Sequence, residues 1–369
     1  MYTEFNVKNY KSLRDLSVAL SPTTLILGRN NVGKTSLLEA VWIHFGYDIS
    51  DLWVRTHSFR GHEITRNLQE FFGQMVNRFD PQSQIELSAK GDWGHGSRTL
   101  YMKLEPREQF ETNIEPPPTE TMGKQRTTGI AKESAYQVAL EYLAEDGLRS
   151  KASTWVVEEQ LSPTVFGVAL RSTRIPHQSS IRRPIGIFQA SRTPYVERES
   201  ADRVSAIATE KQTKVLLDFL RVVEPRIQDI RTHTEEGKQY PEVDIGEPTL
   251  VPAALMGGGF IKLLDIGTAA HYSRRGGIVL IDEIENGLHH QTLPQVWKGI
   301  GALGKAFGVQ FIATTHSLEC VSAAYQAFSE EGADGFLLQR LQRRDGRVES
   351  VKFDIATLGA ALDAGLEVR

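Results

Sequence analysis

Residues 28–35 have the types and the spacing of a phosphate-binding loop. They fit the pattern G-x-x-x-x-G-K-[ST], in which backbone N–H groups surround the phosphates of a nucleoside triphosphate. Lys34 would reach the β- and γ-phosphates, and the Thr35 hydroxyl would ligate Mg²⁺. The residues expected to line the nucleotide are Gly28, Arg29, Asn30, Asn31, Val32, Gly33, Lys34, Thr35 and Ser36. The sequence therefore predicts binding of a nucleoside triphosphate, with ATP and Mg²⁺ as the expected pair.

Asp282 and Glu283 directly follow the apolar run 278–281. A carboxylate at the carboxyl end of a strand beside a phosphate loop would hold Mg²⁺, and the next one would act as general base on the attacking water. Strand ends often carry solvated acids, so this pattern is weak alone, but the upstream loop favours a catalytic interpretation. His316 ends a later apolar run, where a γ-phosphate sensor would lie. A single histidine is otherwise most often a surface or core residue.

Gly257, Gly258 and Gly259 precede a segment with the pattern of a helix. Glycines at a helix N-terminus form an anion site, because the backbone N–H groups can approach a phosphate closely. The alternative is a flexible linker.

The elements that must position these residues have the pattern of a parallel sheet covered by helices on both faces. Short apolar runs bounded by turns predict strands, and apolar positions at helical spacing predict helices. The expected strands are 23–27, 185–188, 277–282 and 309–316, and the expected helices are 36–42, 201–232 and 260–273.

The middle of the chain has a looser pattern. Residues 3–20 predict a β-hairpin before the loop, and 83–88 and 100–104 predict strands. Residues 135–143 fit a strand or a helix, with a strand favoured, and Pro116–Pro118 predicts an exposed loop. The expected division is an ATPase core of residues 1–45 and 185–369, with residues 46–184 as an inserted lobe rich in β-strands and loops.

Bulk composition limits the function classes. The chain has 369 residues, of which 40% are hydrophobic and 24% charged, and its net charge is −4. This acidic balance gives no global attraction to nucleic acid or membranes. Cys320 is the single cysteine, so no internal disulfide forms, and it is expected to be a small buried hydrophobe. The start of the chain has no signal-peptide pattern, and no run reaches the ~18 apolar residues of a membrane span. We expect a cytoplasmic protein without membrane contact.

The order of these motifs resembles the ABC-type ATPase heads of the SMC and RecF groups. It resembles more closely the AAA ATPases of the OLD (overcoming lysogenisation) class, which occur in bacterial and phage-defence operons. The resemblance covers residues 1–45 and 185–369. It is carried by residues 5–13, 28–36, 257–264, 280–289 and 314–319.

The resemblance implies an α/β P-loop NTPase fold of the ABC/SMC-head type, with a mixed and parallel sheet flanked by helices. It also implies a head-to-head homodimer or higher homo-oligomer, with each phosphate loop completed by Gly257–Gly259 of the other copy. Residues 286–288 would form the D-loop at that interface. Gln189 is a candidate for the Q-loop glutamine, and Arg192 is its rival. The usual serine before the signature glycines is missing here.

Many OLD-class proteins continue into a Toprim nuclease domain with acidic clusters. After His316 this chain has only scattered acids, so a nuclease or toxin effector would be a separate chain. Residues 171–198 are locally basic, which fits either a groove for DNA or RNA or a solvated loop. Their basic residues are Arg171, Arg174, His177, Arg182, Arg183, Arg192 and Arg198. His289 and His290 lack further ligands for a zinc site.

Three functions compete. The first is an ATP-hydrolysing dimeric switch in anti-phage defence or DNA maintenance, which acts on nucleic acid or controls a separate effector. The second is an ATP-locked, non-hydrolysing scaffold for a toxin or nuclease. The third is the ATPase subunit of a membrane transporter, which usually has a Leu-Ser-Gly-Gly-Gln signature that this chain lacks.

Overall fold

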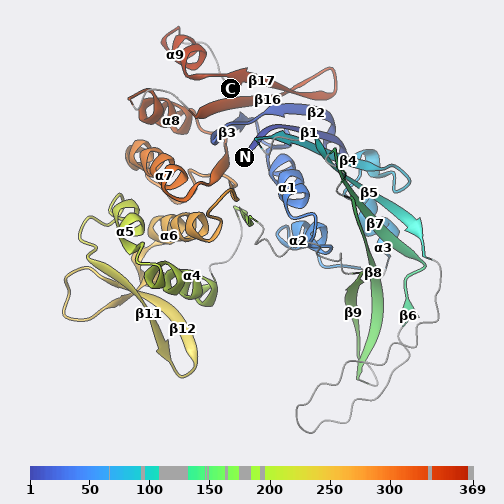
Figure 1. Cartoon of the computed structure of the whole chain (residues 1–369), viewed down its shortest axis with the longest axis horizontal. Helices are drawn as coiled ribbons and strands as arrows, with labels where there is room; N and C mark the ends of the chain where they lie inside the picture. The colour runs from blue at the N-terminus through green and yellow to red at the C-terminus, as the bar shows by residue number, and fades with distance from the viewer. Residues whose placement is uncertain are drawn as a thin grey trace.

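The computed structural model describes most of the chain. The described residues are 1–65, 67–92, 96–107, 132–145, 147, 149–162, 165–173, 184–191, 196–330 and 335–364. The expected loop at Pro116–Pro118 lies outside them. They form an α/β fold with two large sheets and helices packed on both faces of the central one (Figure 1).

The central sheet has six strands in the order β10-β14-β15-β3-β16-β17. The first five are parallel to one another, and the last pairs antiparallel with its neighbour. This is the mixed and parallel sheet that the sequence predicted. The strands are β3 (Thr23–Gly28), β10 (Gly186–Gln189), β14 (Ile278–Ile281), β15 (Gln310–Thr315), β16 (Phe336–Arg344) and β17 (Arg347–Phe353).

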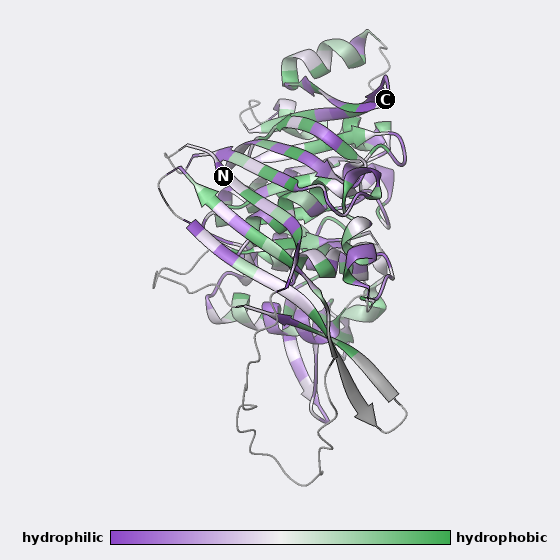
Figure 2. Cartoon of the chain, turned by 90° about the vertical axis from the view of Figure 1, so that its right-hand side faces the viewer, coloured by the Kyte–Doolittle hydropathy of each residue, from purple (hydrophilic) through white to green (hydrophobic). Residues whose placement is uncertain are grey.

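The second sheet is antiparallel and combines the N-terminal hairpin with strands from the middle of the chain. Its order is β2-β1-β4-β5-β7-β8-β6, with β9 paired to β8. Its strands alternate between hydrophilic and hydrophobic positions, as expected for a sheet with one buried face (Figure 2). They are β1 (Tyr2–Tyr10), β2 (Leu13–Ala19), β4 (Ile85–Gly91), β5 (Arg98–Pro106), β6 (Lys132–Glu133), β7 (Tyr136–Ala144), β8 (Arg149–Ser162) and β9 (Val165–Ser172).

The helices divide between two hydrophobic cores. Helix α1 lies between the two sheets, with α2 and α3 nearby, and α4 to α8 cover the other face of the central sheet (Figure 1). The helices are α1 (Lys34–Phe45), α2 (Leu52–Ser58), α3 (Leu68–Gly73), α4 (Glu197–Thr209), α5 (Thr213–Leu220), α6 (Gly258–Tyr272), α7 (Leu293–Phe307), α8 (Leu318–Glu330) and α9 (Ile355–Asp363).

Strand β3 shows how the central sheet serves both cores. Ile26 points into the core around α1, whereas Leu25 and Leu27 point into the core under α6 and α7, and all three are almost fully buried. Successive side chains of a strand point to opposite faces, so a continuous apolar run is what a sheet buried on both faces requires.

Several sequence predictions are confirmed. The hairpin of residues 3–20 is β1 and β2, and residues 135–143 form the strand β7 rather than a helix. The strands predicted at 83–88 and 100–104 correspond to β4 and β5. The middle strands extend the sheet of the N-terminal hairpin, because β4 pairs with β1. The described strands of the middle region and the hairpin therefore share one sheet, and the division of the chain into core and lobe stays a prediction.

The prediction of one helix over residues 201–232 is wrong. Helix α4 ends at Thr209, α5 ends at Leu220, and residues 229–235 form a strand. Lys211 has a positive φ of 59°, which breaks the helix between α4 and α5. The helical spacing of the apolar residues was predicted correctly, because α4 and α5 pack on the same core. It did not reveal the turn that separates the two helices. Strands β11 (Asp229–Glu235), β12 (Lys238–Asp244) and β13 (Val251–Pro252) form a small third sheet.

Candidate active site

The loop between β3 and α1 is shaped by two glycines. Gly33 has a φ of 111°, and a Cβ atom there would lie 2.7 Å from Leu13 Cδ2 and 2.8 Å from Ser12 Oγ. A Cβ atom on Gly28 would lie 2.8 Å from the carbonyl oxygen of Leu341. The loop therefore fits between the β1–β2 turn and β16 only with glycine at both positions. The N-terminal hairpin therefore packs directly against the phosphate loop.

Lys34 is the first residue of α1 and is largely buried. Its Nζ donates hydrogen bonds to the carbonyl oxygens of Gly28 at 2.7 Å and Arg29 at 3.1 Å. Burial lowers the pKa of Lys34, and the carboxylates of Asp282 and Glu283 oppose this shift. The ammonium group is thus held inside its own loop, where a phosphate would be a stronger acceptor than a carbonyl.

Asp282 follows β14 and is bound by two threonines. Thr35 Oγ1 donates to both of its carboxylate oxygens, at 3.2 and 3.0 Å, and Thr314 Oγ1 donates at 2.6 Å. Burial raises the pKa of Asp282, while these hydrogen bonds oppose the increase. A hydroxyl and a carboxylate at this distance are oxygen ligands that suit Mg²⁺. The structure thus brings together the two predicted metal ligands from positions 35 and 282.

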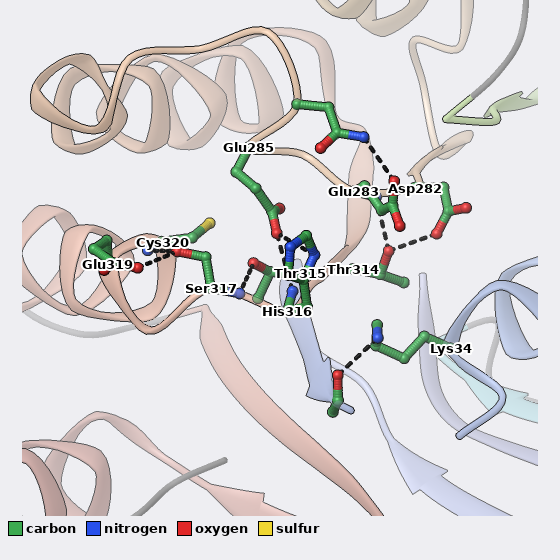
Figure 3. A network of polar contacts seen from close by, with 12 residues as sticks. Lys34, Asp282, Glu283, Glu285, Thr314, Thr315, His316, Ser317, Glu319 and Cys320 are labelled. Atoms are coloured by element: carbon green, nitrogen blue, oxygen red, sulfur yellow. Dashed lines mark hydrogen bonds and ion pairs between the residues drawn. The ribbon is translucent and has the colours of Figure 1, made fainter. Parts of the chain in front are cut away.

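Glu283 stands in an unusual backbone conformation, with a φ of 50°. A left-handed conformation at a residue other than glycine costs of order 1–3 kcal/mol and persists only where the surroundings enforce it. Its N–H donates to Thr314 Oγ1 at 2.9 Å, and its carboxylate accepts from Asn286 Nδ2 at 2.6 Å. Figure 3 shows Thr314 below Asp282 and Glu283 with a contact to each, and Lys34 further below in the view. Thr314 thus places both acids, a role that the sequence prediction missed.

His316 lies just after β15 and is held by Glu285. Glu285 Oε1 lies 3.0 Å from His316 Nδ1 and also accepts from the His316 N–H at 3.0 Å. The His316 side chain is 45% exposed, so its ring remains accessible next to the loop of Asp282 and Glu283. The contact with Glu285 orients the ring, and the role of phosphate sensor stays a prediction.

Gln189 ends β10, beside β14. Its carbonyl oxygen accepts from the Asp282 N–H at 2.9 Å, and its Nε2 is buried without a hydrogen-bond partner among the described residues. A buried amide donor without a partner is costly and suits a site that a ligand or water completes. Arg192, the rival candidate, lies outside the described residues.

Gly257, Gly258 and Gly259 form the start of α6. Gly257 has a φ of 89°, and no atom lies within 4 Å of a Cβ built on Gly257 or Gly258. No side chain in the described part of the chain caps this helix end. Gly257 and Gly258 are exposed, so this uncapped helix N-terminus is open to an anion.

A buried network of charged side chains joins α1 to the turn that packs on the phosphate loop, and the sequence prediction missed it. Glu39 on α1 is 1% exposed, and its carboxylate contacts Lys11 Nζ at 2.7 Å and Arg60 Nε at 3.0 Å. A buried carboxylate is stable only with such partners. Lys11 belongs to the β1–β2 turn, so the network joins α1 to the hairpin that packs on Gly33. The sequence offered one indication of this network: Glu39 is an acidic residue among the apolar residues of α1.

A cavity of about 750 Å³ lies next to Asp282, between the end of β10 and helices α2, α4 and α6. Its lining includes Arg55, Gln189, Arg203, Lys262 and Asp265. Burial raises the pKa of Asp265 from 3.8 to about 6, and Arg203 opposes this increase. The cavity thus carries both cations and acids beside the predicted metal site.

Asp265→Asn should stabilise the protein above pH 7. The folded-state pKa of Asp265 is raised, so the folded state binds more protons than the unfolded state between about pH 4 and pH 6, and stability falls as pH rises through this window. We expect the variant to gain about 1–2 kcal/mol in free energy of unfolding at pH 7.5 and less at pH 5. Urea unfolding at the two pH values measures this. Asp363→Asn at the end of α9 is the control, and an equal gain at both pH values contradicts the prediction.

Other predicted positions are less informative. Cys320 is fully buried, as expected, and burial raises its thiol pKa to about 12. Of the basic residues in 171–198, Arg171 and Arg198 are described and exposed, and the others lie outside the described residues. In the described part of the chain, no three His, Cys, Asp or Glu residues are grouped as a metal cluster, and no helix is long and apolar enough to cross a membrane.

Two protein-family models match successive parts of the chain. Residues 1–133 match a model described as an AAA ATPase domain. Residues 169–322 match a model described as an AAA domain, putative AbiEii toxin, Type IV TA system. These two segments contain the phosphate loop, the start of α6, the acids after β14 and His316.

Two curated proteins and one solved structure extend this similarity. An ATP/GTP phosphatase of Helicobacter pylori is 23% identical over 351 residues, which cover 90% of this chain and 89% of that protein. The OLD nuclease of Thermus scotoductus is 38% identical over 60 residues, which cover 16% of this chain and 11% of the nuclease. An Smc head crystallised with the C-terminal winged-helix domain of ScpA has a TM-score of 0.51 at 15% identity, and the match covers 98% of this chain and 99% of the head. This last similarity concerns the fold.

Proposed function

We propose that this chain, an AAA ATPase of the OLD-like and SMC-like type, hydrolyses ATP with Mg²⁺ in sites that two copies complete together. The observation that carries the proposal is the convergence of Lys34, Thr35, Asp282 and Glu283 from two distant parts of the chain. The name of the Helicobacter pylori relative supports hydrolysis of a nucleoside triphosphate, and the choice of ATP is part of the proposal.

The chemistry follows from the positions of these groups. N–H groups of the loop and Lys34 would hold the phosphates, and Lys34 would exchange its two carbonyl acceptors for phosphate oxygens. Mg²⁺ held by Thr35 and Asp282 would neutralise negative charge on the phosphates. Glu283 would take a proton from the attacking water, and Asn286 orients its carboxylate for this role.

The exposed start of α6 supports a site shared between two copies. Gly257 and Gly258 are exposed, and the positive end of the helix dipole would favour a phosphate there. A nucleotide on the phosphate loop of one copy would then meet α6 of the second. ATP would close such a dimer and hydrolysis would release it, which makes the assembly a switch.

Gly258→Asp tests the shared site directly. Nothing lies within 4 Å of a Cβ at Gly258, and an acid in the first turn of a helix is favourable, so the variant should fold as the wild type does. Its carboxylate would repel a phosphate of the second copy. We expect ATP turnover and ATP-dependent dimer formation to fall at least about tenfold, with ATP affinity of the single chain unchanged. Phosphate release and light scattering measure these quantities.

Gly258→Ala is the matched control, because it adds a Cβ without charge and should keep dimer formation. Normal turnover in Gly258→Asp would contradict a shared site at α6. Repeating the turnover assay with duplex DNA or RNA tests the further proposal that nucleic acid regulates the switch.

The proposed cellular role is anti-phage defence or DNA maintenance through a separate nuclease or toxin chain. It is supported by the partial similarity to an OLD nuclease and by the toxin-related description of the model that matches residues 169–322. An ATP-locked scaffold remains the alternative, since it uses the same binding residues and differs only in turnover.

A further inference from the structure

Lys262 is a partly buried lysine to which the sequence prediction assigned no role. It lies at the start of the second turn of α6, and its Nζ donates a hydrogen bond of 2.6 Å to the carbonyl oxygen of Glu283. Burial lowers its pKa to about 8, against the opposing effect of nearby carboxylates such as Glu285. This partly buried side chain lines the cavity beside Asp282, and its ammonium group contacts the backbone of Glu283, the proposed general base.

The backbone of Glu283 is held from both sides. Its N–H donates to Thr314 Oγ1 at 2.9 Å, and its carbonyl oxygen accepts from the Asn286 N–H at 3.0 Å as well as from Lys262. Thr314 belongs to the neighbouring strand and Asn286 to the same turn. Among these three partners, Lys262 alone comes from the helix that begins with the glycines. The left-handed conformation of Glu283 therefore depends in part on the position of α6.

A second contact joins α6 to the same turn. A Cβ atom on Gly259 would lie 2.9 Å from the carbonyl oxygen of Gly287, so the helix start and the turn pack backbone against backbone. Lys262 lies four residues after Gly258 and three after Gly259, so the three positions share one face of the helix. A phosphate bound at the glycines would lie about one helical turn, ~5.4 Å along the axis, from Lys262.

We propose that Lys262 is a positioning residue that connects the glycine-rich start of α6 to the backbone of Glu283. The inference rests on the proposed function, in which a second copy places its nucleotide on α6. A shift of α6 on docking would then pass through Lys262 to Glu283, which serves the other nucleotide of the dimer. Each site would sense whether the opposite site is filled, so ATP hydrolysis should be cooperative.

Lys262→Met tests this connection. The variant keeps most of the side-chain volume but cannot donate to Glu283, and we expect kcat to fall about tenfold, with an unchanged ATP dissociation constant. The Hill coefficient for ATP should fall from above one to about one. Lys262→Arg keeps a donor and should restore most of the rate and the cooperativity. Steady-state turnover against ATP concentration and equilibrium binding of a fluorescent ATP analogue measure these quantities.

Lys214→Met on α5 removes a lysine whose side chain is 87% exposed and serves as the control. Lys262→Gln is the second variant if methionine prevents folding, with the same expected result. The inference is overturned if kcat and the Hill coefficient are unchanged, if the wild-type dimer shows no cooperativity, or if ATP affinity falls as much as kcat.

Dimer formation separates this inference from the proposed function. ATP should still dimerise a chain that carries both Lys262→Met and Glu283→Gln. If Glu283→Gln alone forms no dimer, the proposed function fails. If that single variant dimerises but the double variant does not, Lys262 acts at the interface itself, and the positioning role is overturned.

Discussion

Glu283→Gln should reduce steady-state ATP hydrolysis about 1,000-fold and leave the protein as a stable ATP-bound dimer. Glutamine has the shape of glutamate but cannot take the proton of the attacking water, and general base catalysis contributes about 10²–10⁴-fold. Its amide oxygen can still accept from Asn286 Nδ2, which now contacts the carboxylate at 2.6 Å, so the turn should keep its conformation. Phosphate release measures the rate, and gel filtration with light scattering measures the mass with and without ATP and Mg²⁺.

Glu330→Gln on α8 is the matched control, because it makes the same change in a side chain that is 52% exposed and contacts Lys298. It should hydrolyse ATP as the wild type does. If Glu283→Gln hydrolyses ATP at the wild-type rate, Glu283 is not the general base. If the molar mass of the variant is the same with and without ATP, the result counts against an ATP-dependent dimer. If the wild type itself dimerises with ATP but shows no turnover, the ATP-locked scaffold is favoured.

Lys34→Met should weaken ATP binding about 100-fold. The ammonium group of Lys34 is expected to bind the β- and γ-phosphates, and loss of one partner from a buried, hydrogen-bonded charge pair costs roughly 2–5 kcal/mol. Without ligand, Lys34 Nζ donates to the carbonyl oxygens of Gly28 and Arg29, which belong to the same loop. The substitution removes these two local hydrogen bonds, and we expect little change in the free energy of unfolding. Isothermal titration with a slowly hydrolysed ATP analogue and Mg²⁺ measures the dissociation constant.

Lys298→Met on α7 removes a lysine that pairs with Glu330 at the surface and should leave the dissociation constant unchanged. An affinity for ATP that is equal in Lys34→Met and wild type would mean that the nucleotide does not bind at residues 28–35. Thermal unfolding of both variants without ligand shows whether the fold is intact.

Much of the fold follows from local sequence pattern. Strands β3, β10, β14 and β15 and helices α1 and α6 were predicted, because continuous apolar runs and turn residues are set by neighbours in the chain, whereas β16 and β17 were not among the predicted strands. The segment 201–232 shows the limit of this approach. Its helical spacing was correct over α4 and α5, but the positive φ of Lys211 and the strand from Asp229 left no distinct apolar pattern.

The catalytic residue types were also predictable, because the phosphate loop is continuous in sequence and the acids lie next to each other after a strand. The residues that place them were not. Thr314, Lys262 and Asn286 lie in segments that carry the family resemblance, and Asn286 was expected in the D-loop. Their hydrogen bonds to Asp282 and Glu283 were not predicted and are known only from the structure.

The sequence by itself determined which residues form the phosphate loop and the acidic strand end, and that three glycines stand before a predicted helix. The tertiary structure alone decided that Thr35 meets Asp282 and that Lys262 meets Glu283. The physical reason is the strand order of the central sheet. The phosphate loop follows β3, whereas Asp282 follows β14, and β15 lies between these strands, so parallel pairing brings distant carboxyl ends to one edge.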